Sequence, residues 1–173
     1  MNHWYMLTLV GKDRPGIVAH VSSALFEGGC NLGEATMMRL GGNFSIMLMV
    51  QSELNNKGLH DLVMPVAESM DLHLHVDHIE GGLHQHLDPD VRITVYGADR
   101  AGIVAKVTGA LAEAGLHILD LESDVAGSSD KPIYIMHIEG HASEGIEALR
   151  SALEVVHREG IEVQIAPVQT LIG

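Results

Sequence analysis

Two short glycine-bearing segments contain the residues best suited to hold a small ligand. They read Gly11-Lys-Asp-Arg-Pro-Gly16 and Gly97-Ala-Asp-Arg-Ala-Gly102. Each segment follows alternating apolar residues and precedes apolar residues at every fourth position, so it joins a predicted strand to the start of a predicted helix. Backbone amides at a helix N-terminus attract anions, and glycine lets a ligand approach the main chain closely. Both segments therefore predict a loop that can bind a carboxylate.

Three residues of the first segment have predicted roles of their own. Pro15 suits the first turn of the helix, because a backbone N–H at that position would have no acceptor within the helix. Asp13 and Arg14 are candidates to cap the helix and to pair with neighbouring charges. They are equally candidates to touch the ligand, and the sequence leaves the two roles open.

Asn31 is a further candidate for ligand contact, because it begins the next predicted strand directly after the first helix. His117 stands at the same place in the second half of the chain, 86 residues later. An amide can donate to a carboxylate and accept from an ammonium group, as an α-amino acid requires. A neutral imidazole offers one donor and one acceptor on opposite ring edges, so the two positions differ in what they can bind. A turn or capping residue and a surface histidine are the structural alternatives.

A histidine-rich stretch offers possible metal ligands. His73, His75 and Asp77 alternate along one predicted strand, and His84 and His86 follow in the adjoining segment. Imidazole and carboxylate groups suit zinc or nickel. Alternate residues of a strand lie about 6 to 7 Å apart, so two can share an ion but three in a line rarely converge on one. The pattern favours a polar face or a dimer contact, with a metal site and a pH sensor as alternatives.

Several functional classes are excluded by what the sequence lacks. Ser22 and Ser23 lie in the helical pattern, and no nucleophile elbow, P-loop or dinucleotide fingerprint occurs, so neither catalysis nor a bound cofactor is expected. The net charge is −13 and the ten lysine and arginine residues are scattered, which argues against direct binding of nucleic acid. Aromatic residues make up 3% of the chain, too few for an RNA-recognition module of the same topology.

Composition also bounds the cellular location. No run of 18 apolar residues and no signal peptide is present, so we expect a cytoplasmic protein that does not enter a membrane. The single cysteine, Cys30, fits a reducing compartment and is expected to be a small buried hydrophobe.

The chain repeats itself, and the repeat fixes the expected fold. Residues 9–19 align with residues 95–105 at a constant offset of 86, half the length of the chain. Each half predicts strand, helix, strand, strand, helix, strand. This is an α+β fold of two ferredoxin-like βαββαβ domains, each an antiparallel four-stranded sheet with two helices on one face. The domains are predicted at residues 1–80 and 90–173, with a linker at 81–89.

Individual elements follow from periodicity and turn residues. In the first half, strands are predicted at Tyr5–Leu9, about 31–39, 44–52 and 72–79, and in the second half the last strand is predicted at 161–166. Glycines at 28, 29 and 115 are expected to end the first helix of each half, and Ser143 to cap the last helix. Pro65 should kink the second helix or mark a later start. The open sheet face and the sheet edges are expected to pair with the other half or with a second chain. Four methionines are candidates either for that face or for filling the cores: Met6, Met37, Met47 and Met49.

The residues of the first loop carry a family resemblance. Asp-Arg-Pro-Gly-Ile-Val at 13–18, followed by Gly-Cys-Asn-Leu at 29–32, resembles tandem ACT-domain proteins of the branch that includes glycine cleavage system transcriptional repressors. In ACT domains a small ligand, usually an amino acid, binds between two domains against the first loop and the start of the second strand. The resemblance therefore implies ligand contacts at these positions: Gly11, Asp13, Arg14, Pro15, Gly16, Asn31, Gly97, Asp99, Arg100, Gly102 and His117. Ala101 and His117 stand where the first half has proline and asparagine.

What the resemblance implies is a non-enzymatic regulator. It would bind a small amino acid, glycine or serine-like, at ACT-domain interfaces, form a homodimer, and control transcription of glycine metabolism by contacting a separate DNA-binding protein. Two alternatives of other classes are a regulatory subunit of a metabolic enzyme and a metal or pH sensor based on the histidines.

Overall fold

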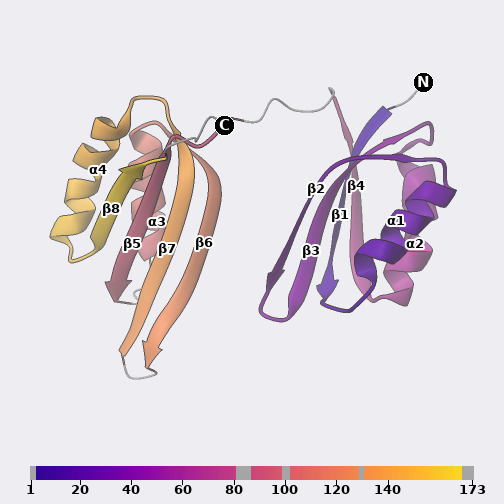
Figure 1. Cartoon of the computed structure of the whole chain (residues 1–173), viewed down its shortest axis with the longest axis horizontal. Coiled ribbons are helices and arrows are strands. Elements are labelled where there is room, and N and C mark those ends of the chain that lie inside the picture. The colour runs from indigo at the N-terminus through magenta and orange to yellow at the C-terminus, as the bar shows by residue number, and fades with distance from the viewer. Residues whose placement is uncertain (1–2, 81–86, 99–101, 129–130, 169–173) are drawn as a thin grey trace. The chain divides into compact units, whose positions relative to one another are not determined.

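In the computed structural model the chain divides into two compact units, Met1–Gln85 and His86–Gly173 (Figure 1). The structure describes residues 3–80, 87–98, 102–128 and 131–168. Most of the predicted linker, residues 81–86, therefore lies outside the described residues, as do His84 and His86. Each unit is considered by itself.

The first unit has the predicted order of elements. These are β1 (His3–Lys12), α1 (Ile17–Glu27), β2 (Asn31–Leu40), β3 (Asn43–Ser52), α2 (Asn56–Ser69) and β4 (Leu72–Ile79). The strands form one antiparallel sheet in the order β2-β3-β1-β4. Both helices lie on the same face of that sheet (Figure 1).

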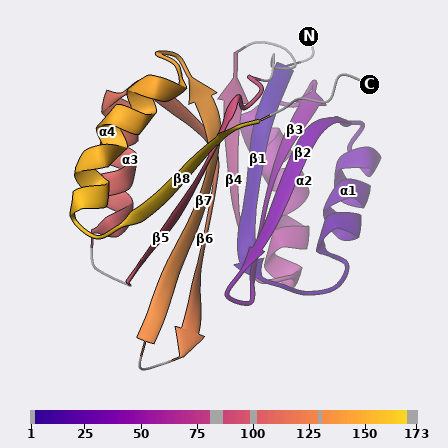
Figure 2. The same ribbon diagram turned by 60° about the vertical axis from the view of Figure 1, so that its left-hand side comes forward.

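The second unit repeats the arrangement. Its elements are β5 (Val91–Ala98), α3 (Ile103–Glu113), β6 (Leu116–Ser128), β7 (Lys131–Ala142), α4 (Ile146–Arg158) and β8 (Glu162–Pro167). The antiparallel sheet has the order β6-β7-β5-β8, and α3 and α4 cover one of its faces (Figure 2). The predicted α+β fold of two βαββαβ units is therefore confirmed.

Each core forms between the helices and the facing side of the sheet. Alternate residues of the central strand and every fourth residue of the first helix are buried, as their period predicts. In the first unit these are Tyr5, Leu7, Leu9, Ile17, Val21 and Leu25, and in the second unit Val91, Ile93, Val95, Ile103, Val107 and Leu111. Cys30 is buried at the edge of the first core.

Glycine ends the first helix of each unit, as predicted. After α1, Gly29 adopts φ 71° and its N–H donates to the Phe26 carbonyl, while the Cys30 N–H donates to the Leu25 carbonyl. This pair of bonds is a Schellman motif, which satisfies the last carbonyls of the helix. Gly115 adopts φ 79° after α3. No helix in the described part of the chain is long and apolar enough to cross a membrane.

The structure excludes one of the two alternatives predicted for Pro65 and shows that the predicted cap of the last helix was wrong. α2 begins at Asn56 and runs through Pro65 to Ser69, so the proline does not mark a later start. The N-cap of α4 is Gly145, not Ser143. The Ser143 hydroxyl instead donates to the Gly115 carbonyl at 2.8 Å, and therefore ties the start of α4 to the end of α3.

A β-bulge decides which methionines face away from the helices. Met6, Met47 and Met49 lie on that open face, because their strand neighbours Leu7, Leu48 and Val50 point into the core. The register of β2 shifts between Leu32 and Ala35, and this shift reverses the alternation along the rest of the strand. Met37 consequently pairs with Ile46 on the helix side of the sheet, so the open-face alternative was wrong for this residue.

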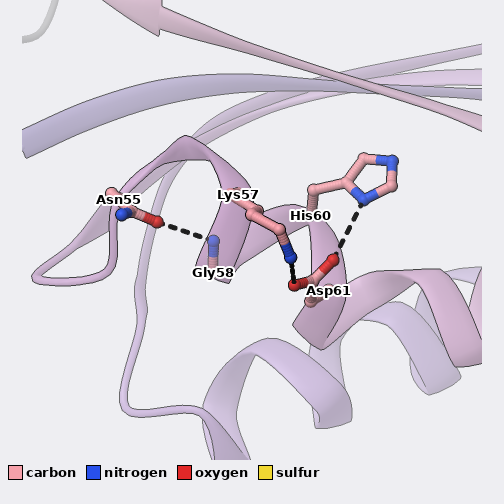
Figure 3. Close-up of polar contacts among 5 residues, drawn as sticks. All are labelled: Asn55, Lys57, Gly58, His60 and Asp61. Carbon is pink, nitrogen blue, oxygen red and sulfur yellow. Dashed lines mark hydrogen bonds and ion pairs between the residues drawn. The ribbon is translucent and has the colours of Figure 1, made fainter.

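The start of α2 is fixed by a polar network (Figure 3). Asn55 is the N-cap, and its side-chain oxygen accepts from the Gly58 N–H at 2.8 Å. One turn further, the Lys57 ammonium donates to the Asp61 carboxylate, and His60 Nδ1 lies 3.7 Å from the same carboxylate. The hydrogen bond from Lys57 is the main reason why the pKa of Asp61 is lowered from its ordinary value.

Glycine at position 11 is required by close packing, which gives a stability test. A Cβ on Gly11 would lie 2.6 Å from the backbone carbonyl oxygen of Asp71, so Gly11→Ala must displace a strand. We expect a loss of about 1–3 kcal/mol in the free energy of unfolding, measured by circular dichroism in urea. Gly109→Ala adds the same methyl group in the interior of α3, where nothing lies within 4 Å, and should gain about 0.5–1 kcal/mol. Equal effects of the two substitutions would contradict this packing.

The ion pair in α2 predicts a pH dependence. In an NMR titration, the Asp61 carboxyl should titrate below the ordinary aspartate value, and Lys57→Met should raise its pKa toward that value. Because the folded-state pKa is lowered, the associated stability is present at neutral pH and is lost as the pH falls through that pKa. Lys106→Met, which removes an ion-paired lysine of the other unit, should leave the Asp61 titration unchanged.

Candidate functional site

The loop between β1 and α1 is shaped by Gly16. This glycine is the N-cap of α1 and has φ 89° and ψ −1°, the geometry of the third residue of a type II turn. Pro15 precedes it, at the position that proline favours in such turns, and therefore lies before the helix. Its predicted place in the first helical turn was wrong. Gly102 has almost the same conformation, φ 87° and ψ 0°, at the start of α3.

Asp13 is held in the loop by two contacts. Its N–H donates to the Gly42 carbonyl at 3.1 Å, and its carboxylate forms an ion pair with the guanidinium of Arg39 at the end of β2. The side chain of Asp13 is 25% exposed and that of Arg39 is 68% exposed. The predicted pairing of Asp13 with a neighbouring charge is thus confirmed.

No described side chain caps α1, so the predicted capping role of Asp13 and Arg14 was wrong. The N-cap position is occupied by Gly16, which has no side chain to accept from the helix. His20, one turn into α1, places Nδ1 2.7 Å from the Gly16 carbonyl oxygen, which also accepts from the His20 backbone N–H. The positive end of the helix dipole is therefore not countered by a side-chain cap.

A pocket of about 540 Å³ lies against this loop. It is bounded by the loop, the first turn of α1, the end of β2 and the start of β3. The lining residues are Asp13, Arg14, Pro15, Gly16, Ile17, Val18, Ala19, Met37, Arg39 and Phe44. Four of the predicted ligand-binding residues therefore line one pocket. Gly11 is outside it, and the close approach of the Asp71 carbonyl accounts for that glycine.

Asn31 lies at the other end of the same sheet. It pairs with Gln51, which pairs with Trp4, whereas the loop follows Gly11, seven residues further along β1. At about 3.3 Å per residue, Asn31 is about 23 Å from the loop. The arrowheads of β1 and β2 in Figure 1 mark the loop end of the sheet, and β2 starts at the opposite end. One unit alone does not bring Asn31 to the pocket.

The corresponding segment of the second unit is described only at its two ends. Asp99 and Arg100 lie outside the described residues, while Gly97 is near the end of β5 and Gly102 is the N-cap of α3. His117 is exposed near the start of β6 and is opposite His141 on β7. The His141 ring is in turn 2.9 Å from the carboxylate of Asp90. His117 is therefore placed as Asn31 is, at the end of its sheet away from the loop.

The part of the pocket that comes from β2 and β3 was not predicted from the sequence. Arg39 and Phe44 are paired across the two strands beside Gly11, and the matching pair beside Gly97 is Val125 and Tyr134. These positions are distant from the loop motif along the chain, and they become neighbours only through strand pairing. The one available signal in the sequence was that Arg39 in the first half corresponds to Val125 in the second half.

The histidine-rich strand does not assemble a metal site in the described part of the chain. His73, His75 and Asp77 all lie on the open face of β4, and His75 Nε2 is 3.1 Å from the Asp77 carboxylate. Among the described residues, no group of three histidine, cysteine, aspartate or glutamate side chains is placed to hold a metal ion.

Comparison with known proteins relates both units to one family. The model of the ACT domain matches residues 3–77 and 90–166. The chain is 22% identical, over 138 residues, to the glycine cleavage system transcriptional repressor of Escherichia coli (strain K12), covering 79% of this chain and 73% of that protein.

Solved structures share the fold over almost the whole length. A structure of an unknown protein from Galdieria sulphuraria is 23% identical with a TM-score of 0.76, and covers 98% of this chain and 100% of that one. A candidate glycine cleavage system transcriptional repressor is 17% identical with a TM-score of 0.74, covering 98% and 99%. With two matched segments, each folded as a βαββαβ unit, this chain belongs to the ACT domain family.

Proposed function

We propose that this chain is a non-enzymatic regulatory protein that binds a small amino acid, such as glycine or serine, and signals through protein contact. The observation that carries the proposal is the pocket beside α1, lined by Asp13, Arg14 and Gly16. Its helix start has no side-chain cap and suits a carboxylate, and Arg14 and Arg39 add positive charge. Membership of the ACT family and the likeness to a glycine cleavage system repressor support an amino acid as the ligand.

The complete site takes residues from two chains. Asn31 is about 23 Å from the loop of its own unit, but it begins β2, which is an edge strand of the sheet. An edge strand offers unpaired backbone groups to a second chain. Antiparallel pairing of two β2 strands puts the start of one beside the end of the other, where the loop and Arg39 lie. A homodimer built in this way gives each pocket an Asn31 from the partner chain.

The ligand acts by favouring one arrangement of the domains. It can shift such an equilibrium only by the difference between its affinities for the two arrangements, and a ligand held between two chains has such a difference. The proposed recipient of the signal is a DNA-binding transcription factor in the cytoplasm, contacted directly. This suits a chain of net charge −13, which is repelled by nucleic acid itself. Neither a cofactor nor catalysis is part of the proposal.

Calorimetry with purified full-length protein tests both ligand and site. We expect glycine or L-serine to bind, and Asn31→Ala to weaken that binding about tenfold or more, since it removes hydrogen bonds to a charged ligand. His117→Ala makes a comparable change at the matching position of the second unit and should leave the affinity unchanged.

Two results would contradict the proposal. Folded protein that binds neither amino acid would rule out the ligand class, and an Asn31→Ala variant with the affinity of the unchanged protein would rule out the role of Asn31. If a pull-down recovers a metabolic enzyme and no transcription factor, the proposed recipient of the signal is wrong and the chain is a regulatory subunit of that enzyme.

A further inference from the structure

The lining of the pocket in the first unit includes an ion pair of two side chains with opposite charges. The carboxylate of Asp13 comes from the loop and the guanidinium of Arg39 from the end of β2, and both residues line the pocket. An α-amino acid is a zwitterion, with a carboxylate and an ammonium group on neighbouring atoms. The ion pair therefore presents the two charges that complement such a ligand.

In the second unit the position of Arg39 is not occupied by a cation, although the N-cap glycine Gly102 has the conformation of Gly16. Val125 takes the position of Arg39, because each is paired with the aromatic residue beside the first glycine of its loop. Two residues earlier on the strand, Ser123 stands where the first unit has Met37. The cation at the end of the strand is thus a property of the first unit and is not required to form the fold.

Exposure makes the ion pair easy to open. Arg39 is two-thirds exposed on an edge strand, and ion pairs in water contribute little to stability. A bound zwitterion can replace this ion pair by two others, one with Arg39 and one with Asp13. Neither protein charge is then left without a partner. The planar guanidinium can bind the carboxylate of a ligand through two parallel hydrogen bonds. Such two-point binding is stronger and more specific than a contact through one hydrogen bond.

We propose that Arg39 and Asp13 are the specificity-determining pair for the ligand. In the free protein they bind each other; in the complex Arg39 binds the carboxylate of the amino acid and Asp13 binds its ammonium group. This inference rests on the proposed function, and it adds that the first unit selects for both charges of an α-amino acid. Compounds that carry only one of the two charges bind weakly. They leave either Asp13 or Arg39 without an ionic partner, or they are displaced when the two residues pair with each other again.

The test compares ligands that differ by one charged group, using calorimetry and competition on the full chain. Methylamine is glycine without its carboxylate and acetate is glycine without its ammonium group; ethanolamine and 3-hydroxypropionate are the matching compounds for L-serine. The unchanged protein should bind the amino acid at least about tenfold more tightly than either partner compound. Arg39→Val, which copies the second unit, should reduce amino-acid affinity about tenfold or more, and it should strengthen rather than weaken binding of the amine, because Asp13 then has no competing cation.

Controls separate ligand recognition from a structural role. Arg92→Val removes another exposed, ion-paired arginine from a strand and should leave all affinities unchanged. Arg39→Val should keep the circular dichroism spectrum and a melting temperature within about 4 °C of the unchanged protein, as expected for an exposed ion pair. Equal weakening of amino acid and amine would indicate a structural role and overturn the inference.

The remaining outcomes are also distinguishable. If the unchanged protein binds glycine or L-serine and Arg39→Val binds it as tightly, this inference fails and the proposed function stands. If the unchanged protein binds neither amino acid, the proposed function fails, and the inference fails with it.

Discussion

The left-handed glycine at the start of the first helix is the constraint on which the candidate site depends. At φ 89°, Gly16 holds a conformation that strains any residue with a side chain, and it turns the chain from β1 into α1. Its lack of a side chain leaves the helix start without a cap. Asp13 in the same loop is paired with Arg39, and both residues line the pocket together with Gly16. Gly102 repeats the conformation, so the constraint is built into both units.

Fold and chemistry have diverged to different extents between the two units. The βαββαβ order, the sheet order and the buried stripes are the same in both. The side chains at the ends of the sheet are not: Arg39 corresponds to Val125, and Asn31 corresponds to His117. Backbone geometry is maintained by glycine and by core packing, which both units need. The polar side chains around the loop contribute little to stability, so they are free to differ, and only the first unit combines the arginine with the asparagine.

Periodicity predicted the fold well because burial repeats with the geometry of each element. Leu7 and Leu9 alternate in a strand, and Val21 and Leu25 follow a helix, so local sequence was sufficient there. Local sequence was insufficient where one residue shifts the pairing register of a strand or forms a hydrogen bond to a residue distant in the chain. The bulge in β2 moved Met37 to the helix side, and Ser143 found an acceptor on a distant glycine. Arg39 was missed for the same reason, since only strand pairing brings it to the loop.

If one amino-acid site is built from two copies of the chain, mixing two variants that are each defective should restore binding. Gly16→Val disables the loop, because a β-branched residue cannot adopt its conformation, and Asn31→Ala disables the contributed amide. In a symmetric dimer of random composition, a mixed pair holds one site with both defects and one with neither. Each variant alone should bind glycine or L-serine weakly, and an equal mixture, unfolded and refolded together, should regain full affinity at about a quarter of its sites. A mixture that binds no better than either variant alone would contradict a site built from two copies of the chain.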